Sequence, residues 1–249
     1  MFSNKYIFTY AAIMVTVVAI ILSSAATLLQ PMQDFNKRVE KMSGILASAD
    51  IYPESKQEVP ESYKEYITEE WVINNNGDII SKYADGELKM GDFRAFDIDL
   101  KTQLDKVKAG NIEEAHFPIY VFTNKGDTSF IVPLRGKGLW GPIWGNIALD
   151  SDFRTVRGAT FGHKSETPGL GAEISLPEFQ NQFKGKTIFN ENYEFTSIEV
   201  VKGGVENSNI NPSHGVDAIS GGTITSNGVS DMLEDVLSIY KPFVEKHII

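Results

Sequence analysis

The sequence predicts an α+β protein with one N-terminal transmembrane helix followed by a mixed, mainly antiparallel extramembrane domain. Three observations lead to this fold class. They are an uncharged run near the N-terminus, several strand pairs separated by short turns, and a helical pattern close to the C-terminus. Short turns favour antiparallel pairing, because parallel strands need long crossover connections.

Composition excludes several classes of function. The formal net charge is −10, so the chain has no basic surplus with which to displace counterions from nucleic acid. There is no cysteine, which excludes disulfides, thiolate zinc sites, iron–sulfur ligation and a cysteine nucleophile. We expect no metal site and no catalytic residue among the four histidines, which lack ligand spacing and serine or carboxylate partners: His116, His163, His214 and His247.

The transmembrane helix is predicted over residues 6–29, after a short tail at 1–5. No charged residue lies between Tyr6 and Leu29, and a helix that rises ~1.5 Å per residue needs ~20 apolar residues to cross a bilayer. A cleaved signal peptide is the alternative, with Ser24-Ala25-Ala26 as its cleavage site. That alternative is disfavoured, because the apolar core of a signal peptide spans only ~7–15 residues.

Neither the orientation of this helix nor an ion path follows from its residues. Lys5 precedes the span and three basic residues follow it, so the positive-inside rule does not select a side. The absence of charge inside the span argues against conduction by this helix. A stripe of small residues suits close packing against a partner helix: Thr9, Ala12, Thr16, Ala19, Ser23 and Ala26.

A connecting helix and linker are expected over residues 30–60, and the extramembrane domain over 61–249. Apolar residues at helical spacing predict a short amphipathic helix from Met32 to Ala49. In the domain, strand pairs are predicted around turns at 75–77, 125–127 and 150–153, with a short helix from Phe96 to Val107 between the first two pairs.

The C-terminal helix follows a hydroxyl-rich turn. Its apolar face is predicted from the spacing of Val229, Met232, Leu233, Val236, Leu237 and Tyr240. We expect the helix to begin near Ser226, capped by Thr225 or Ser226. The Gly221-Gly222 pair permits a tight turn, and free N–H groups at the helix start attract anions, which predicts a phosphate near Thr223. The alternative is that these residues form only a cap and a loop.

Three sequence blocks resemble those of FMN-binding domains. Residues 217–223, DAISGGT, resemble their flavinylation motif D-x-x-[ST]-G-A-T, with Gly222 in place of the usual alanine. Residues 166–171 read ETPGLG, a signature of the same domains, and residues 138–141, GLWG, resemble their G-x-G-L-W segment. The resemblance implies FMN bound covalently through a phosphoester to Thr223, formed by a dedicated flavin transferase.

The resemblance also implies the residues around the cofactor. For the isoalloxazine ring they are Leu139, Trp140, Glu166, Thr167, Gly169 and Leu170, and for the phosphate end Ser220, Gly221, Gly222 and Thr225. Two alternatives stay open at this point. Trp140 can be a core residue, and Glu166 can cap the turn without contacting the ring.

The anchor, the blocks and the length together are similar to the C-subunit family of sodium-translocating NADH:quinone oxidoreductases. This resemblance implies an electron-relay subunit in the inner membrane with a periplasmic FMN domain, the other membrane subunits being its partners. The sequence contains no nicotinamide fingerprint, so hydride would enter elsewhere. One alternative is the flavinylated G subunit of the Rnf ferredoxin:NAD complex. The long segment from Asp50 to Leu134 favours the C-subunit family over this alternative. Another is an anchored sensor or ligand-binding module.

Overall fold

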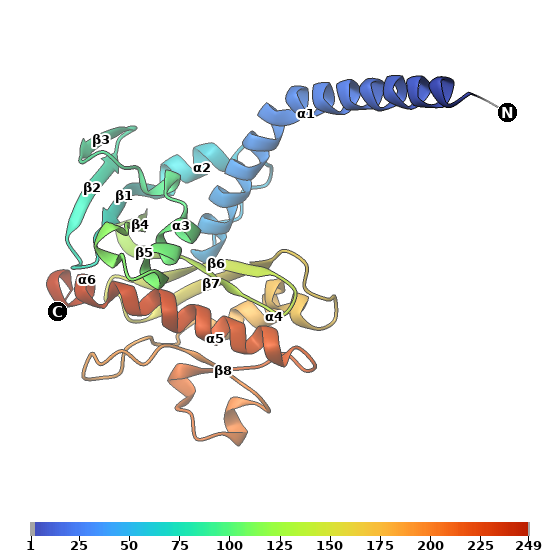
Figure 1. The fold of residues 1–249 in the computed structure, drawn as a ribbon. Helices are drawn as coiled ribbons and strands as arrows, with labels where there is room; N and C mark the ends of the chain where they lie inside the picture. The colour runs from blue at the N-terminus through green and yellow to red at the C-terminus, as the bar shows by residue number, and fades with distance from the viewer. Residues whose placement is uncertain (1–2, 249) are drawn as a thin grey trace. The chain divides into compact units, whose positions relative to one another are not determined.

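A computed structural model describes residues 3–248 of the chain (Figure 1). The chain divides after Lys41 into two compact units. The first helix, α1, runs from Asn4 to Ser48 and therefore begins in the first unit and ends in the second.

The first unit is helical, and α1 is long and apolar enough to cross a membrane, by length and composition. The hydroxyls of Thr16 and Thr27 donate to the backbone carbonyls of Ala12 and Ser23, one turn earlier, which satisfies them without water. Pro31 lies inside this helix. The helix expected over 32–49 is therefore the continuation of α1, because Pro31 removes only one N–H donor and does not end the helix.

The core of the second unit is a seven-stranded antiparallel sheet of order β3-β2-β1-β4-β5-β6-β7. This confirms the predicted mainly antiparallel α+β class. The strands are β1 (Ile67–Ile73), β2 (Ile79–Ala84), β3 (Glu87–Met90), β4 (Phe117–Asn124), β5 (Asp127–Lys137), β6 (Pro142–Asp150) and β7 (Val156–His163). A separate parallel pair is formed by β8 (Glu199–Val201) and β9 (Gly215–Asp217).

All three predicted hairpins are confirmed, and local chemistry explains their turns. In the first, the side chain of Asn74 accepts hydrogen bonds from the N–H groups of Asn76 and Asp78. In the second, Lys125 and Gly126 both have positive φ, as a tight two-residue turn between twisted strands requires. In the third, the carboxylate of Asp152 accepts from backbone N–H groups of the turn.

The segment expected to form one helix from Phe96 to Val107 forms two elements. A 3₁₀ turn, η1, spans Ala95–Asp97, and α3 spans Leu100–Lys108. The carboxylate of Asp99 caps α3 by accepting from the N–H groups of Lys101 and Thr102, so this acidic residue sets the later start. The remaining short helices are α2 (Val59–Tyr66), η2 (Ile112–Glu114), η3 (Gly171–Ser175), α4 (Pro177–Gln180), η4 (Asn181–Phe183), η5 (Val205–Asn207), η6 (Pro212–His214), η7 (Ser238–Tyr240) and α6 (Lys241–His247).

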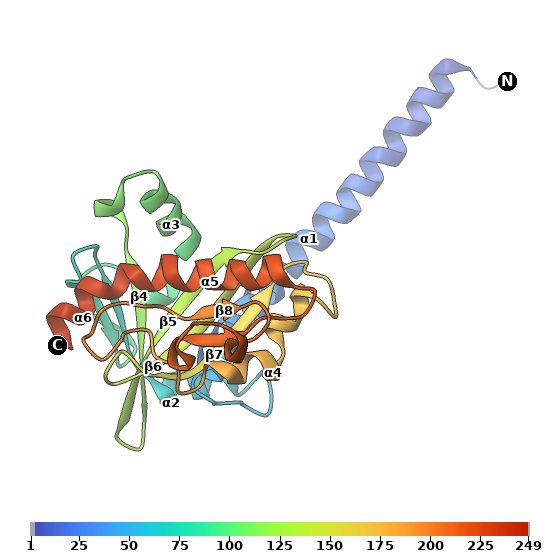
Figure 2. The same cartoon turned by 90° about the horizontal axis from the view of Figure 1, so that it is seen from below.

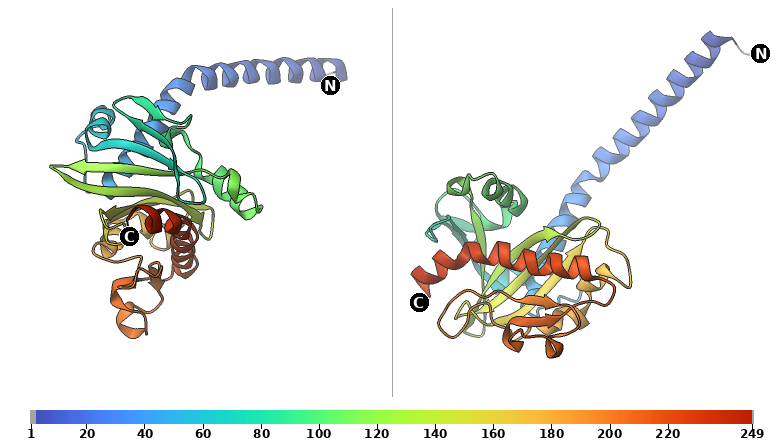
Figure 3. Two further views of the ribbon diagram at one scale, coloured as in Figure 1. Left: turned by 90° about the vertical axis from the view of Figure 1, so that its left-hand side faces the viewer. Right: turned by 60° about the horizontal axis from the view of Figure 1, so that its bottom comes forward.

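The C-terminal helix α5 (Thr223–Leu237) crosses one face of the sheet and packs on β5 (Figures 2 and 3). Its predicted apolar face is confirmed: Val229, Met232, Leu233, Val236 and Leu237 are buried. Tyr240 follows in η7 and its hydroxyl donates to the carbonyl of Pro118. This packing fixes the start of α5 beside the connection between β5 and β6.

The last turns of α1, residues 42–48, lie on the other face of the sheet (Figure 1). Ile45 and Leu46 are fully buried there, and the hydroxyl of Thr160 on β7 donates to the carbonyl of Gly44. The sheet is thus covered on both faces, as a sheet with many apolar positions on each face requires.

Candidate functional site

Two of the three motif blocks, and the helix turn that follows the third, meet at one buried carboxylate, that of Glu166. Its Oε1 accepts from the backbone N–H of Trp140 at 2.8 Å, and its Oε2 accepts from the hydroxyl of Thr225 at 2.6 Å. The side chain of Glu166 is nearly sealed from solvent, with 4% of its surface exposed. The loop between β5 and β6, the loop after β7 and the first turn of α5 are therefore joined through one residue.

Two glycines make this close approach possible. A Cβ on Gly138 would lie 2.6 Å from Oε1 of Glu166, and a Cβ on Gly171 would lie 2.5 Å from the hydroxyl oxygen of Thr225. Real Cβ atoms do not approach oxygen so closely, so a larger residue at either position would displace the carboxylate or the helix turn. The glycines of the GLWG and ETPGLG blocks therefore have a packing role.

The start of α5 differs from the prediction in two respects. The helix begins at Thr223, three residues before the expected start, and Gly222 occupies the N-cap position without a side-chain cap. Thr225 and Ser226 are not caps: Thr225 donates to Glu166, and the hydroxyl of Ser226 accepts from the N–H of Ile219. The prediction was wrong because both hydroxyls find tertiary partners, so neither needs a helix N–H.

The first turn of α5 leaves backbone donors open. Within residues 3–248, no acceptor meets the N–H groups of Thr223, Ile224 and Thr225. The turn before it has the shape that a glycine permits: Gly221 has φ of +74° and packs against the side chain of Leu170. A Cβ on Gly222 would lie 3.1 Å from Cγ2 of Ile219, so the space for the alanine methyl of the usual motif is narrow here.

The hydroxyls of this turn fall into two groups. Thr225 and Ser226 are buried and hydrogen-bonded. Thr223 is half-buried and Ser220 is exposed, and among the described residues the hydroxyls of these two have no hydrogen-bond partner. Of the four hydroxyls of this turn, those of Thr223 and Ser220 are therefore the ones without a hydrogen bond among the described residues.

Large apolar side chains are exposed on the loops that bear the motif blocks and on the first turn of α5. Trp140 exposes 64% of its surface and Ile224 exposes 58%, and Leu139 and Leu170 are exposed as well. The alternative reading of Trp140 as a core residue is thus wrong, because its backbone is held by Glu166 while its ring faces outward. Sequence reasoning missed Ile224, although an apolar residue on the outer side of an amphipathic helix was the available signal.

The remaining predicted site residues lie on the exposed loop after β7. Thr167 and Gly169 are exposed, the carbonyl of Thr167 accepts from the N–H of Leu170, and the N–H of Gly169 donates to the carboxylate of Glu173. Asp217, which opens the hydroxyl-rich block, accepts from the N–H of Val205. Within residues 3–248, no group of three histidine, cysteine or acidic side chains is arranged to hold a metal ion.

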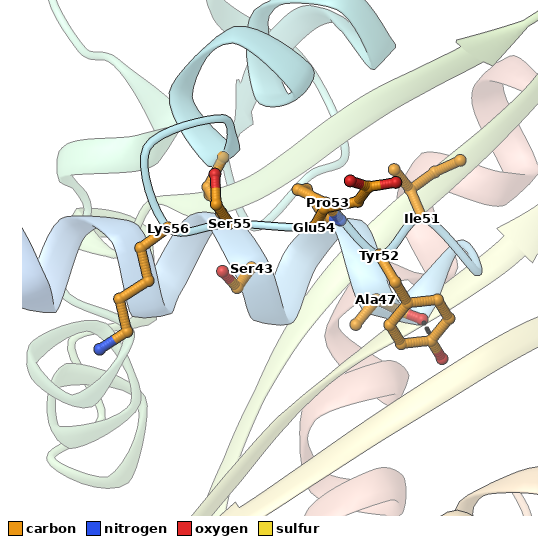
Figure 4. A pocket seen from close by; sticks show the side chains of 9 residues that line it. Ser43, Ala47, Ile51, Tyr52, Pro53, Glu54, Ser55 and Lys56 are labelled. Atoms are coloured by element: carbon orange, nitrogen blue, oxygen red, sulfur yellow. Dashed lines mark hydrogen bonds between the residues drawn. The ribbon is translucent and has the colours of Figure 1, made fainter.

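The cavities of the domain lie mostly apart from this site. A hollow of about 270 Å³ lies between the last turns of α1 and the loop at 51–56 and contains none of the predicted site residues (Figure 4). A groove of about 860 Å³ runs between α3 and α5 and touches the GLWG block only at Gly141. The candidate site is thus an open surface and not an enclosed cavity. Its marks are the exposed apolar side chains and the N–H groups at the start of α5 that have no acceptor among the described residues.

Comparisons with known proteins match this geometry. The model of the FMN-binding domain family matches residues 138–238, which contain all three blocks. The C subunit of the Na(+)-translocating NADH-quinone reductase of Vibrio campbellii is 36% identical over 239 residues, which cover 92% of this chain and 90% of that protein. The corresponding protein of Haemophilus ducreyi is 33% identical and covers 90% of this chain and 85% of its own length.

Solved structures give the same result. The crystal structure of the C subunit of the Na(+)-translocating NADH-quinone reductase from Parabacteroides distasonis is 41% identical, with a TM-score of 0.73 over 87% of this chain and 96% of that one. NqrC of Shewanella oneidensis is 25% identical, with a TM-score of 0.65 over 85% of this chain and 99% of that one. From its sequence and its fold, the chain belongs to the family of C subunits of the Na(+)-translocating NADH-quinone reductase.

Proposed function

We propose that this chain is the electron-relay subunit of a Na(+)-translocating NADH:quinone reductase and carries FMN through a phosphoester to Thr223. The observation that carries the proposal is the state of the hydroxyls. Thr223 lies at the first position of α5, and its hydroxyl has no hydrogen-bond partner among the described residues, whereas the hydroxyls of Thr225 and Ser226 are buried and hydrogen-bonded. A covalent site needs an accessible, unengaged hydroxyl, and Thr223 meets that need inside the matched motif.

The surroundings of Thr223 fit FMN at both of its ends. A phosphate at this hydroxyl would meet the open N–H groups of the first helix turn, where the helix dipole also favours negative charge. The flat apolar ring would find exposed apolar surface on Leu139, Trp140 and Leu170. Thr167, Gly169, Ser220 and the two glycines before Thr223 complete the proposed contacts.

The attachment step is a group transfer. A P–O bond forms between the hydroxyl oxygen of Thr223 and the phosphorus of an activated flavin nucleotide, the hydroxyl proton is lost to a base, and the activating group leaves with the electrons of its own P–O bond. No oxidation state changes. We assign the step to a separate flavin transferase, because the buried carboxylate beside the start of α5, that of Glu166, already accepts two hydrogen bonds.

When bound, FMN supplies the redox chemistry, and the residues of this chain hold it at the surface. We assign no catalytic residue, in line with the lack of a nicotinamide motif in the sequence. Electron donor and acceptor are then neighbouring subunits of the same membrane complex. The open position of Trp140 and Ile224 suits a cofactor that exchanges electrons with other proteins.

The membrane arrangement belongs to the same proposal. We propose that residues 6–29 form a single retained span, residues 30–60 a connection, and residues 61–249 the FMN domain on the periplasmic side of the inner membrane. The apolar composition and length of α1 support the span. A covalent bond would prevent loss of the cofactor from that compartment.

The test is coexpression of the full chain with a flavin transferase, followed by denaturing electrophoresis and detection of flavin fluorescence. Thr223→Ala should abolish the fluorescent band. Ser220→Ala is the matched control, since Ser220 is the other accessible hydroxyl of the turn, and this variant should keep the band. A fluorescent band in Thr223→Ala, or its loss in Ser220→Ala alone, would overturn the assignment. Wild-type chain without flavin would favour the ligand-binding module instead.

A further inference from the structure

Glu166 does more than fill space between the motif blocks. It lies in the ETPGLG block, accepts from the backbone of Trp140 in the GLWG block, and accepts from Thr225 in the first turn of α5. The backbone N–H of Trp140 donates to one carboxylate oxygen and the hydroxyl of Thr225 to the other. Among residues 3–248, no lysine or arginine forms an ion pair with Glu166, so this buried carboxylate is held by hydrogen bonds.

We infer that Glu166 is a positioning residue that holds the acceptor turn against the wall of the flavin site and, through its charge, lowers the reduction potential of the bound flavin. The inference rests on the proposed attachment to Thr223 and deepens it. Its two parts, geometry and charge, are carried by different features of the same side chain and can be separated by substitution.

The geometric part follows from where the two hydrogen bonds end. Thr225 is two residues beyond Thr223 on the same helical turn, and the N–H of Trp140 belongs to the residue whose ring is exposed beside the site. The carboxylate therefore fixes the distance between the attachment point and the apolar wall. Without these two hydrogen bonds, Glu166 no longer links the loop after β5 to the start of α5.

The charge part follows from burial. A charge that is screened poorly by water acts more strongly on its neighbours than an exposed one. Reduction adds negative charge to the flavin, and a nearby carboxylate disfavours that charge in the same way that it disfavours a second carboxylate. Removal of the charge from Glu166 should therefore make the flavin easier to reduce.

The experiment compares Glu166→Gln and Glu166→Ala in the full chain, each coexpressed with the transferase. The amide of Glu166→Gln keeps the geometry, because its oxygen accepts from Trp140 and its NH₂ donates to the hydroxyl of Thr225. We expect nearly normal flavin loading and a midpoint potential shifted to more positive values. Glu166→Ala removes both bonds, and we expect a several-fold loss of loading.

Glu70→Gln is the matched control for loss of a buried carboxylate. Glu70 exposes 2% of its surface and accepts from Arg94, Tyr63 and the backbone of Phe96, away from all three motif blocks. This substitution should lower the thermal stability of the domain and leave the midpoint potential unchanged. A potential shift of equal size in Glu70→Gln would show that the effect reports stability and would overturn the inference.

A further measurement separates this inference from the attachment itself. In the Thr223→Ala chain, hydrogen exchange of the Trp140 amide should be slow, and Glu166→Ala in that background should accelerate it many-fold. If Thr223→Ala keeps covalent flavin, the attachment proposal fails while the exchange result still decides the role of Glu166. The inference would be overturned if Glu166→Ala kept the wild-type values of Trp140 amide exchange, flavin loading and flavin midpoint potential.

Discussion

Gly171→Ala tests the packing of the site with one methyl group. Its Cβ would lie 2.5 Å from the hydroxyl oxygen of Thr225 and 2.6 Å from Oε2 of Glu166. Two responses are open to the domain. It can shift the backbone, as in other overpacked sites, at a cost of ~1–3 kcal/mol. Or it can give up the hydrogen bond to the carboxylate, which is worth ~1.5–3 kcal/mol.

Either response outweighs the gain that alanine brings. Replacing glycine stabilises by only ~0.4–1 kcal/mol through the unfolded chain. The net loss should be about 1.5 kcal/mol, which for a domain of this size corresponds to a fall in Tm of ~3–6 °C. Thermal unfolding of the full chain in detergent measures it, and flavin loading should fall in parallel because the link to Glu166 is disturbed.

Gly185→Ala is the control from outside the motif blocks. Gly185 has φ of +75° and no neighbour that a Cβ would touch, so alanine there costs only the strain of left-handed backbone, ~1–2 kcal/mol. This variant should lose stability and keep normal flavin loading. If Gly171→Ala loads flavin as the wild type does and its free energy of unfolding lies within ~0.5 kcal/mol of the wild-type value, as for a neutral surface change, Gly171 has no packing role in the site.

Three further predictions concern the rest of the domain. Burial holds the pKa of His116 below its ordinary value near 6.5. As pH drops below that value the unfolded chain binds the proton before the folded one does, so the free energy of unfolding should fall. His116→Asn should flatten this pH dependence, which denaturant titrations at several pH values measure. The hydrogen bond from Thr102 lowers the pKa of Asp99, which caps α3. The cap therefore stabilises the folded chain at pH values above the ordinary pKa near 3.8, and this stabilisation is lost as pH falls through the lowered pKa. Asp99→Ala should cost ~1 kcal/mol of unfolding free energy at neutral pH and less in acid. Tyr240→Phe leaves the carbonyl of Pro118 without its donor and should cost ~1–3 kcal/mol in chemical unfolding.

Local signals in the sequence were enough for the hairpins and for the apolar face of α5. Turn residues such as Asn74 and Gly126 act through their own backbone and close neighbours, so their effect can be predicted from a short window. The helical spacing from Val229 to Leu237 is equally local, and burial of that face follows from it.

The errors arose where two signals compete, either a local signal with a distant partner or two local signals with each other. Thr225 looks like a cap by position, but its partner Glu166 lies 59 residues earlier in the chain. Asp99 delays the start of α3, although Phe96 fits the helical spacing. Pro31 looks like an end of helix α1, yet the helix continues. Local propensity alone cannot predict which of two competing signals decides the structure, because tertiary contacts contribute as much free energy as local preferences.

The candidate site was predicted residue by residue from the resemblance, and its geometry came from the fold. No spacing rule shows that Glu166 would face inward while Trp140 faces outward. Both orientations follow from glycines that let three separate loops approach one carboxylate, as at Gly138.

The central claim is the bond at Thr223, and peptide mass spectrometry tests it most directly. The full chain, coexpressed with a flavin transferase, is digested, and the fragment that contains residues 217–230 is sequenced by tandem mass spectrometry. We expect one added flavin mononucleotide, less one water, on Thr223. An unmodified fragment from a yellow protein, or the added mass on Ser220 or Thr225, would contradict it.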